Sequence, residues 1–343
     1  MKKLLFILCV VICFAEGNAQ DRQFSQFSAS PLNLNPALTG NNACDWRVGT
    51  NLRSEWLGVN SSFFLGSIYG DVAVGKIKNK KANFAGIGIL GNFDNAGQLN
   101  YRTTDAYLSA AYHLVLGKRA NSALSFGIQG GIRYYSFDIG KIILNENIDF
   151  ITGAITQNNS VVTNSNAIIP DANFGMLYNY KKNDKFGYYI GAAGFHIPQA
   201  SYTFTSGTSS EILRFKFSSH AGMNIGFGDH FSIMPQVIWM WQNSFIQWRV
   251  GTYAKYTITD VRKSKKTVQA VYLGAWFWKS YLGSKMSAAV KYDYGNLTMA
   301  LSYDFDISKL SSLSSMGGAP ELSITYTGCF RRNNNKFGCP VVL

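Results

Sequence analysis

Charged side chains and long hydrophobic runs are both scarce in this sequence of 343 residues. Charged residues make up 15% of it, well below the roughly 25% that soluble globular domains carry. Beyond residue 19, no stretch approaches the about 18 consecutive apolar residues that a transmembrane helix needs. Aromatic residues, by contrast, reach 15%, and there are 33 glycines. This balance favours a closed β-barrel in the outer membrane, and a secreted β-sandwich or propeller is the competing interpretation.

The first 19 residues have the features of a secretory signal peptide. Two lysines precede an apolar run that ends at Ala15, and the small residues up to Ala19 suit cleavage there. The apolar run is too short to anchor the chain across a bilayer. We therefore expect residues 1–19 to be removed and the mature chain to leave the cytoplasm.

Cysteine and histidine are too few and too scattered to predict a metal centre or a catalytic constellation. No metal-binding spacing of Cys and His occurs, and a hydrolase at the barrel rim is a remote alternative. We expect His113 and His220, which alternate with apolar neighbours, to face the lumen. Cys329 and Cys339 flank a polar tail, which predicts a disulfide between them in an oxidising compartment and leaves Cys44 over. The sequence thus predicts no enzyme, no metal and no cofactor.

Segments that alternate apolar and polar side chains recur along the mature chain. In 246–258, for example, Trp248 and Val250 fall on one face, whereas Gln247 and Arg249 fall on the other. This is the pattern of a strand with one apolar and one polar side. We predict fourteen strands, an even number as in single-chain bacterial barrels, at residues 47–57, 61–74, 83–93, 105–117, 123–137, 172–181, 185–197, 211–227, 230–242, 245–258, 267–279, 284–294, 297–306 and 320–330.

The links between these strands sort by length and charge. Those after even-numbered strands are brief or lysine-rich, and the long ones follow odd-numbered strands, at 94–104, 138–171, 198–210 and 307–319. A barrel with short periplasmic turns and long outer loops has this sorting, whereas a sandwich has no reason for it. The basic turns are either solvated or a docking face for an acidic periplasmic partner; nucleic acid is not expected, because no aromatic-interleaved basic groove is present. We assign these lysines to the periplasmic side: Lys76, Lys78, Lys80, Lys81, Lys263, Lys265 and Lys266.

One glycine-rich stretch, GIGILG at 86–91, matches the G-x-G-x-x-G pattern of dinucleotide-binding folds. That pattern requires a helix to open at its third glycine, but the residues that follow, NFDNAGQLN, have no helical period. We instead interpret the stretch as the third strand, in which glycines relieve crowding on a curved wall.

The stretch before the first strand, residues 21–40, is too apolar for a free tail and contains too much proline for a long helix or a central strand. We expect it to be bent but extended, and to bury its apolar side chains. It would either fold into the periplasmic mouth of the barrel as a plug, which we favour, or dock against a secretion partner. The residues assigned to this element are Phe24, Phe27, Pro31, Asn33, Leu34, Asn35 and Pro36.

The two ends of the mature chain resemble a known family. QFSQFSASPLNLNPALTG at 23–40, followed by RVGTNLRSEW at 47–56, is similar to the start of PorP/SprF outer-membrane proteins of the type IX secretion and gliding machinery of Bacteroidetes. Residues 301–327 resemble the last two strands of that family and the serine-rich loop between them, and the Cys-Pro step at 339–340 resembles its tail.

The resemblance implies an all-β protein: a transmembrane antiparallel β-barrel of about 14 strands at 47–330, an N-terminal periplasmic or plug segment at 20–46 and a periplasmic tail at 331–343. It implies an outer-membrane location in contact with lipid, and a role in exporting or anchoring a secreted cargo protein. Such cargo has a C-terminal sorting domain and is often a large adhesin, and other type IX secretion components would be further partners. The alternative is a diffusion channel for small or hydrophobic solutes.

Overall fold

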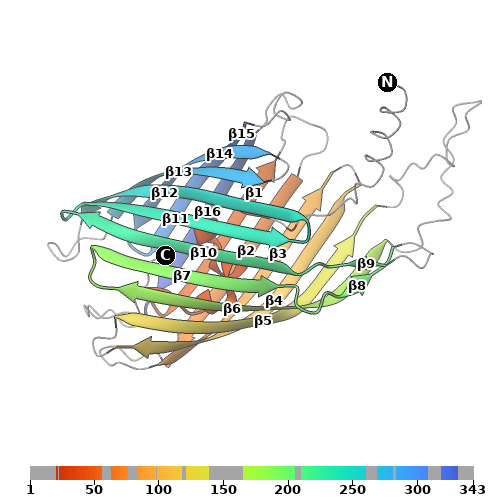
Figure 1. Cartoon of the computed structure of the whole chain (residues 1–343), viewed down its shortest axis with the longest axis horizontal. Coiled ribbons are helices and arrows are strands. Elements are labelled where there is room, and N and C mark those ends of the chain that lie inside the picture. Colours follow the sequence, from red (N-terminus) through yellow and green to blue (C-terminus); the bar gives the residue numbers. More distant parts are fainter. Residues whose placement is uncertain are drawn as a thin grey trace, which may run out of the picture.

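The chain folds into an antiparallel β-barrel that closes between its first and last strands (Figure 1). The computed structural model describes residues 21, 23–55, 63–75, 83–97, 99–117, 121–138, 165–204, 210–259, 269–280, 283–307 and 318–330. Within these residues fourteen strands form the wall, in the order β1-β16-β15-β14-β13-β12-β11-β10-β7-β6-β5-β4-β3-β2. The prediction of an antiparallel barrel of about 14 strands is therefore confirmed.

The wall strands are β1 (Trp46–Glu55), β2 (Phe63–Val74), β3 (Phe84–Ala96), β4 (Tyr101–Leu116), β5 (Ser122–Ser136), β6 (Asn166–Lys181), β7 (Phe186–Phe195), β10 (Lys216–Phe227), β11 (Phe231–Gln242), β12 (Phe245–Thr259), β13 (Gln269–Ser280), β14 (Ser284–Tyr294), β15 (Leu297–Asp306) and β16 (Gly318–Gly328). Two further short strands, β8 (Ser201–Tyr202) and β9 (Glu211–Ile212), pair only with each other. The strand predicted at 211–227 is thus interrupted, because β10 begins only at Lys216.

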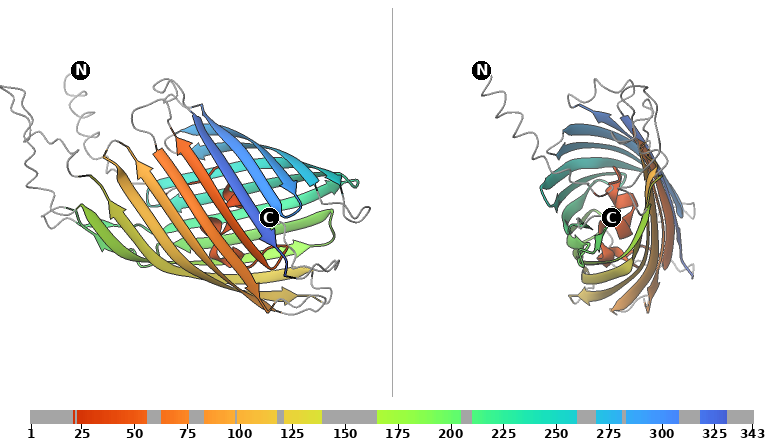
Figure 2. Two further views of the ribbon diagram at one scale, coloured as in Figure 1. Left: turned by 180° about the vertical axis from the view of Figure 1, so that it is seen from behind. Right: turned by 90° about the vertical axis from the view of Figure 1, so that its right-hand side faces the viewer.

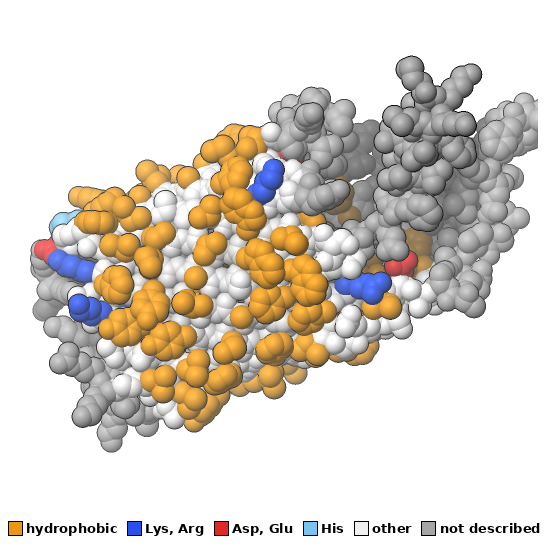
Figure 3. Space-filling view, in the orientation of Figure 1, with side chains coloured by type: hydrophobic (Ala, Val, Ile, Leu, Met, Phe, Trp, Pro, Cys, Tyr) orange, Lys and Arg blue, Asp and Glu red, His pale blue; other side chains and the backbone are white. Residues whose placement is uncertain are grey.

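Each wall strand turns alternate side chains outward and into the lumen. Along β4, Leu108 is 72% exposed, whereas its neighbour Ser109 is buried. Along β12, Trp248 is partly exposed outside and Arg249 is buried inside. Figure 3 shows the outcome on one face: apolar side chains are spread over the wall, and the few charged side chains in view lie toward its two ends. Such a surface suits the hydrocarbon core of a membrane, where exposed charge is costly.

The two ends of the barrel differ in their links. One end, here called the turn end, carries the links 75–83, 117–121, 182–185, 228–230, 260–268 and 295–296, together with the entry into β1. The opposite end, here called the loop end, carries the links 56–62, 97–100, 137–165, 196–215, 243–244, 281–283 and 307–317. The predicted sorting of long links to one end holds, although the link expected at 94–104 is mostly strand because β3 and β4 extend into it.

The first and last strands are joined by backbone pairing and by a disulfide. β1 pairs with β16 from Trp46 to Arg53. Just beyond this pairing, at the turn end, Cys44 is bonded to Cys329. The predicted disulfide between Cys329 and Cys339 is therefore wrong, because barrel closure brings together two cysteines that are 285 positions apart in the sequence. Cys339 itself lies outside the described residues.

The described residues between 21 and 42 lie inside the barrel (Figure 1, Figure 2). They form three short helices, η1 (Phe27–Ala29), α2 (Pro31–Leu34) and η2 (Pro36–Leu38). Pro31 and Pro36 stand at the starts of α2 and η2, where a missing N–H breaks no hydrogen bond. The segment is therefore compact, but its backbone is helical where we predicted a bent, extended chain. No helix in the described ranges is long and apolar enough to span a membrane.

The main apolar core lies between this luminal segment and one side of the wall. Phe27, Leu34 and Leu38 of the segment pack in one buried cluster with Tyr253 of β12 and Trp276 of β13. The barrel interior is therefore a packed core that includes the N-terminal segment, and the apolar residues of that segment are buried as their composition requires.

Candidate functional site

The luminal segment is held by two separate groups of contacts, one for each half. We call residues 33–40 the root and residues 21–27 the head. The root lies nearer the turn end, where the chain continues into β1. The head extends toward the loop end, because Asp21 contacts Arg133 near the end of β5 and Lys216 at the start of β10. The segment therefore runs from the turn end toward the loop end inside the lumen.

Asn35 fixes the root to two neighbouring strands. Its Nδ2 donates to the carbonyl oxygens of Met176 in β6 at 3.0 Å and of Ala192 in β7 at 3.2 Å. Its Oδ1 accepts the backbone N–H of Ala37 at 2.9 Å, which caps the start of η2. Both ends of this buried amide are thus paired, and the Asn-Pro-Ala sequence supplies the cap and the helix start together.

Thr39 ties the end of the root to β4 and β5. Its Oγ1 lies 2.6 Å from Ser109 Oγ, and its carbonyl oxygen lies 2.8 Å from His113 Nε2. The other ring nitrogen of His113 lies 2.7 Å from Ser125 Oγ. His113 faces the lumen as predicted, and both of its nitrogens serve this attachment.

An ion pair holds the turn from the root into β1. The backbone N–H of Gly40 donates to Asp71 Oδ2 in β2 at 2.6 Å. Arg47 Nε of β1 lies 2.9 Å from Asp71 Oδ1, and Arg47 Nη2 also donates to the carbonyl oxygen of Leu38 at 3.3 Å. One carboxylate therefore joins the root, β1 and β2.

Three wall glycines approach the root so closely that no side chain fits between them. A Cβ atom added to any of them would lie within 2.3 Å of an atom of the root: Gly86 of Thr39, Gly127 of Pro36 and Gly175 of Asn35. Any larger residue must displace the root or the wall. Gly86 opens the GIGILG stretch, which lies within β3 as predicted, and its small size serves this contact with the root.

The head is held largely through its backbone. The carboxylate of Glu321 in β16 accepts the N–H of Ser25 at 2.6 Å and the N–H of Gln26 at 3.0 Å. Arg249 Nη1 in β12 donates to the carbonyl oxygen of Phe24 at 2.7 Å and to that of Ser25. We call Glu321 and Arg249 the main-chain clamp, because one binds donors and the other binds acceptors of the same short stretch.

Neighbouring side chains partly offset the cost of burying the main-chain clamp. Arg53 of β1 lies 2.7 Å from Asp304 and 3.4 Å from Glu321. The guanidinium carbon of Arg249 lies 3.3 Å from the centroid of the Trp278 ring. Charges removed from water are costly unless they are paired, and these contacts reduce that cost.

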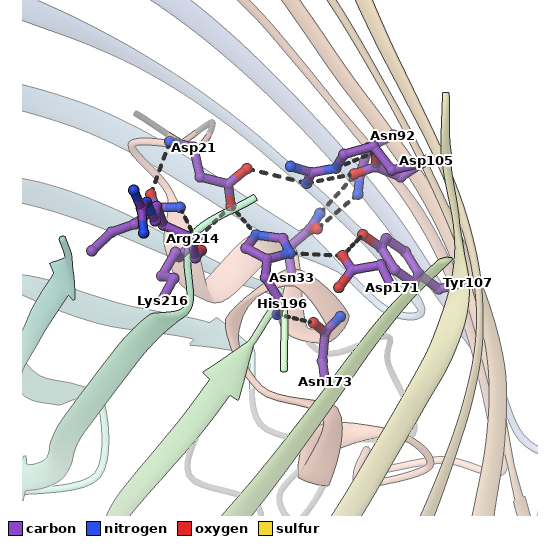
Figure 4. A network of polar contacts seen from close by, with 12 residues as sticks. Asp21, Asn33, Asn92, Asp105, Tyr107, Asp171, Asn173, His196, Arg214 and Lys216 are labelled. Atoms are coloured by element: carbon purple, nitrogen blue, oxygen red, sulfur yellow. Dashed lines mark hydrogen bonds and ion pairs between the residues drawn. The ribbon is translucent and has the colours of Figure 1, made fainter. Parts of the chain in front are cut away.

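Asp21 anchors the start of the head in a second charged cluster (Figure 4). Its carboxylate lies 2.6 Å from Lys216 Nζ, 3.2 Å from Arg133 Nη2 and 3.4 Å from His196 Nε2. Burial disfavours its charged form, but Lys216 and Arg133 outweigh burial and hold the pKa of Asp21 well below its ordinary value. Arg133 also pairs with Asp105 at 2.9 Å. The cluster therefore recognises a carboxylate at this position of the segment.

The wall supports this cluster from behind (Figure 4). His196 Nδ1 lies 2.7 Å from Asp171 Oδ2, which also accepts the hydroxyl of Tyr107 at 2.6 Å. The backbone N–H of His196 donates to Asn173 at 3.0 Å. The two nitrogens of His196 thus face two carboxylates, Asp171 of the wall and Asp21 of the head.

A cavity of about 70 Å³ lies between the head and the wall. The luminal segment lines it with Phe24, Phe27 and Leu34. The wall contributes Gln129 and Ser218, whose Nε2 and Oγ atoms are buried without a hydrogen-bond partner in the described ranges. The head therefore does not fill the space beside it.

The arrangement is one for holding a peptide. In the part of the chain that the structure describes, no group of three His, Cys, Asp or Glu side chains is placed to hold a metal ion. The carboxylates and cations around the head contact one another, the peptide backbone or side chains of the head such as Asp21 and Ser25. What this geometry can do is bind main chain and an acidic residue inside a barrel.

The structure brings together the N-terminal residues that the sequence analysis assigned to the luminal segment. It does not describe the lysines of the basic turns. Phe24, Phe27, Pro31, Leu34, Asn35 and Pro36 are buried in the lumen, and Asn33 pairs with Asn92 through reciprocal amide hydrogen bonds of 2.9 and 3.0 Å. The predicted periplasmic lysines, Lys76, Lys78, Lys80, Lys81, Lys263, Lys265 and Lys266, lie outside the described residues.

Sequence reasoning missed Asp21, Ser25 and Gln26 in the head, and Glu321 and Arg249 in the wall. The Ser25–Glu321 hydrogen bond joins residues 296 positions apart. No local pattern marks such a pair. The only available signal was a buried charge on a lumen-facing strand position, as at Arg249.

Comparison with known proteins gives a family and a fold. The sequence profile of the type IX secretion system membrane protein PorP/SprF family matches residues 16–326. No curated protein is significantly similar to the chain in sequence. A crystal structure of a Pseudomonas aeruginosa FadL homologue is 10% identical with a TM-score of 0.50, over 85% of this chain and 92% of that chain. The Ralstonia pickettii toluene transporter TbuX is 10% identical with a TM-score of 0.47, over 87% and 93%. At such identity the likeness concerns the fold alone.

Proposed function

Because this chain belongs to the PorP/SprF family of type IX secretion system membrane proteins and forms an outer-membrane β-barrel, we propose that it supports the export or surface anchoring of one particular secreted cargo protein. The cargo carries a C-terminal sorting domain and is of the large adhesin kind. Periplasmic or other components of the secretion system are its further partners.

The observation that carries this proposal is the extent of the family match, which covers the luminal segment as well as the wall. The segment lies in the lumen and is hydrogen-bonded to strands β2, β4, β6, β7, β12 and β16. A lumen occupied by its own chain suits a protein that holds a partner better than one that passes solutes freely.

The turn end, on this proposal, faces the periplasm and presents the lysine-rich links to an acidic partner there. Ser244 is exposed at the loop end and Asp184 is exposed at the turn end. Single Ser244→Cys and Asp184→Cys variants are treated with an impermeant thiol reagent on intact cells. We expect labelling at position 244 and none at 184 until the cells are opened. The reverse pattern would invert the orientation.

Affinity isolation tests the function directly. The tagged full-length chain is isolated from native membranes, with a tagged barrel of another family as the matched control. We expect one large secreted protein to be enriched with this chain alone, and to be lost from the surface of cells that lack the chain. If no secreted protein is enriched and surface proteins are unchanged, the proposal is wrong.

A diffusion channel for small or hydrophobic solutes is the second candidate, because the cavity beside the head is partly lined by Phe24, Phe27 and Leu34. Solute flux into liposomes distinguishes the two. The anchoring function predicts flux close to that of protein-free liposomes, since the root and head occupy the lumen. Rapid flux through the full-length chain favours the channel.

A further inference from the structure

We propose that the main-chain clamp is a peptide-binding site, which the head occupies in cis and which a segment of a partner protein takes over in trans. The partner segment carries a carboxylate three residues before the first of two aromatic side chains, as the head does with Asp21, Phe24 and Phe27. The inference rests on the proposed function only for the identity of the partner. The site itself follows from the contacts of the head.

The clamp binds main-chain groups and is therefore not restricted to the sequence of the head. Glu321 binds two consecutive N–H groups, and Arg249 binds two consecutive carbonyl groups. The backbone N–H of Asp21 also donates to Gln242 Oε1 at 3.1 Å. Every peptide carries these groups, so main-chain contacts supply affinity and the side-chain contacts must supply selectivity.

Side-chain contacts around the clamp define which peptide fits. Lys216 and Arg133 bind the carboxylate at the first position. The guanidinium carbon of Arg249 lies 5.7 Å from the centroid of the Phe27 ring, within the range of a cation–π contact. An acidic residue and an aromatic residue six positions later are therefore both recognised.

An amide between these two positions is recognised as well. Gln26 Nε2 donates to Ser302 Oγ at 3.0 Å, and Gln26 Oε1 accepts from Ser323 Oγ at 3.2 Å. Both serines lie on lumen-facing positions of β15 and β16 and are buried. A glutamine, or a residue with the same donor and acceptor, is thus preferred one position before the second aromatic.

The head leaves part of this site unused. Arg249 Nε and Nη2 are buried without a hydrogen-bond partner among the residues that the structure describes, as are Gln129 Nε2 and Ser218 Oγ. All three residues line the cavity beside the head. A partner peptide of larger side chains can occupy that space and satisfy these atoms, which gives it an advantage that the head lacks.

The head can leave without the root. The root is hydrogen-bonded to β2, β4, β6 and β7, whereas the clamp belongs to β12 and β16. The disulfide at Cys44 additionally fixes the chain just after the root. Exchange therefore requires movement of the residues before Pro31 only.

A titration of the full-length chain in detergent tests the proposal. The probe is a fluorescent peptide of residues 21–30, DRQFSQFSAS, and the matched control peptide is NRQASQASAS. Because a tethered head competes at an effective concentration in about the millimolar range, binding to the unmodified chain is expected to be weak. A chain with Asp21→Asn, Phe24→Ala and Phe27→Ala has a weakened head. We expect it to bind the probe at least tenfold more tightly than the unmodified chain and tenfold more tightly than it binds the control peptide.

Two further variants place the binding at the clamp. On the weakened-head background, Glu321→Gln is expected to reduce probe affinity about tenfold. A lock between Thr39→Cys and Ser109→Cys, whose hydroxyls lie 2.6 Å apart, is expected to leave affinity unchanged, since the root stays in place. Heat-modifiable migration in gels verifies assembly of each variant, and Asp21→Asn alone serves if the triple variant does not assemble.

Equal binding of the two peptides, no gain from weakening the head, or loss of binding on locking the root would overturn the proposal. Because the titration uses the purified chain, its outcome is independent of which cargo is isolated from membranes. Failure of peptide exchange leaves the anchoring function intact, and failure to isolate a cargo leaves the peptide site intact.

Discussion

The root and the head lie in the same lumen but are held by different physics. The root is fitted mainly by shape: Gly86, Gly127 and Gly175 admit its backbone. Neutral hydrogen bonds from Asn35 fix it, and one ion pair, Asp71–Arg47, holds its end. The head is held by charges and by contacts to its main chain. Close-packed shape tolerates no substitute, whereas main-chain and ionic contacts can be reproduced by another peptide. Within one short segment, the root can therefore stay bound to the wall while the head is exchanged for another peptide.

The cost of burying polar groups also differs between the head and the root. The head contacts Arg249 and Glu321 of the wall, which are buried, and contributes the half-buried Asp21; the cost of removing such charges from water offsets much of their attraction. The root buries mainly neutral groups that are fully paired, such as Asn35. We therefore expect the head to open at a lower free energy than the root.

The largest expected effect on stability concerns the Cys44–Cys329 disulfide, which joins the chain before β1 to the chain after β16. Replacing Cys44 and Cys329 by serine releases a loop of 285 residues and is expected to lower stability by up to about 5 kcal/mol in the chain-entropy account. Urea unfolding of the barrel in detergent measures this, and Cys339→Ser is the control that should change nothing. Non-reduced peptide maps should contain a Cys44–Cys329 pair, and a Cys329–Cys339 pair would refute the connectivity.

The next largest effect tests the shape fit of the root. Gly127→Val places a side chain where Pro36 lies and is expected to destabilise the barrel by about 3 kcal/mol or to expel the root. Gly130→Val on the same strand is the matched control, because a Cβ there meets nothing within 4 Å. Limited proteolysis of residues 33–40 reports expulsion. Equal tolerance of both substitutions would show that the root is not fitted by the wall.

A smaller effect compares single amides in the two halves. Asn35→Ala removes two hydrogen bonds to the wall and a cap, and is expected to cost about 2 kcal/mol. Gln26→Ala removes two hydrogen bonds from the head and is expected to cost about 1 kcal/mol or less, because the head opens more readily. The same urea unfolding assay ranks them. A larger cost at Gln26 would reverse the comparison.

Alternation along the chain was enough to predict the wall and which side chains enter its lumen, as at His113 and Arg249. The alternation of side chains along a strand is a local property, so it can be recognised without knowing which strands pair with one another. The apolar residues of 21–40 also required burial, whatever their partners. The sequence could not predict that Cys44 pairs with Cys329 or that Glu321 binds Ser25, because closure of the barrel alone makes these residues neighbours. The glycines of GIGILG were placed on the right element, but their contact with Thr39 depends on the fold of a distant segment.

Hydrogen exchange across the luminal segment tests the difference between head and root most directly. It is followed by mass spectrometry on the full-length chain in detergent, with the amides of the wall strands as an internal reference. We predict that residues 33–40 exchange as slowly as the wall, whereas residues 24–29 exchange at least about a hundredfold faster through local opening. The contradictory result is a single rate for the whole segment, either as slow as the wall or as fast as a free tail.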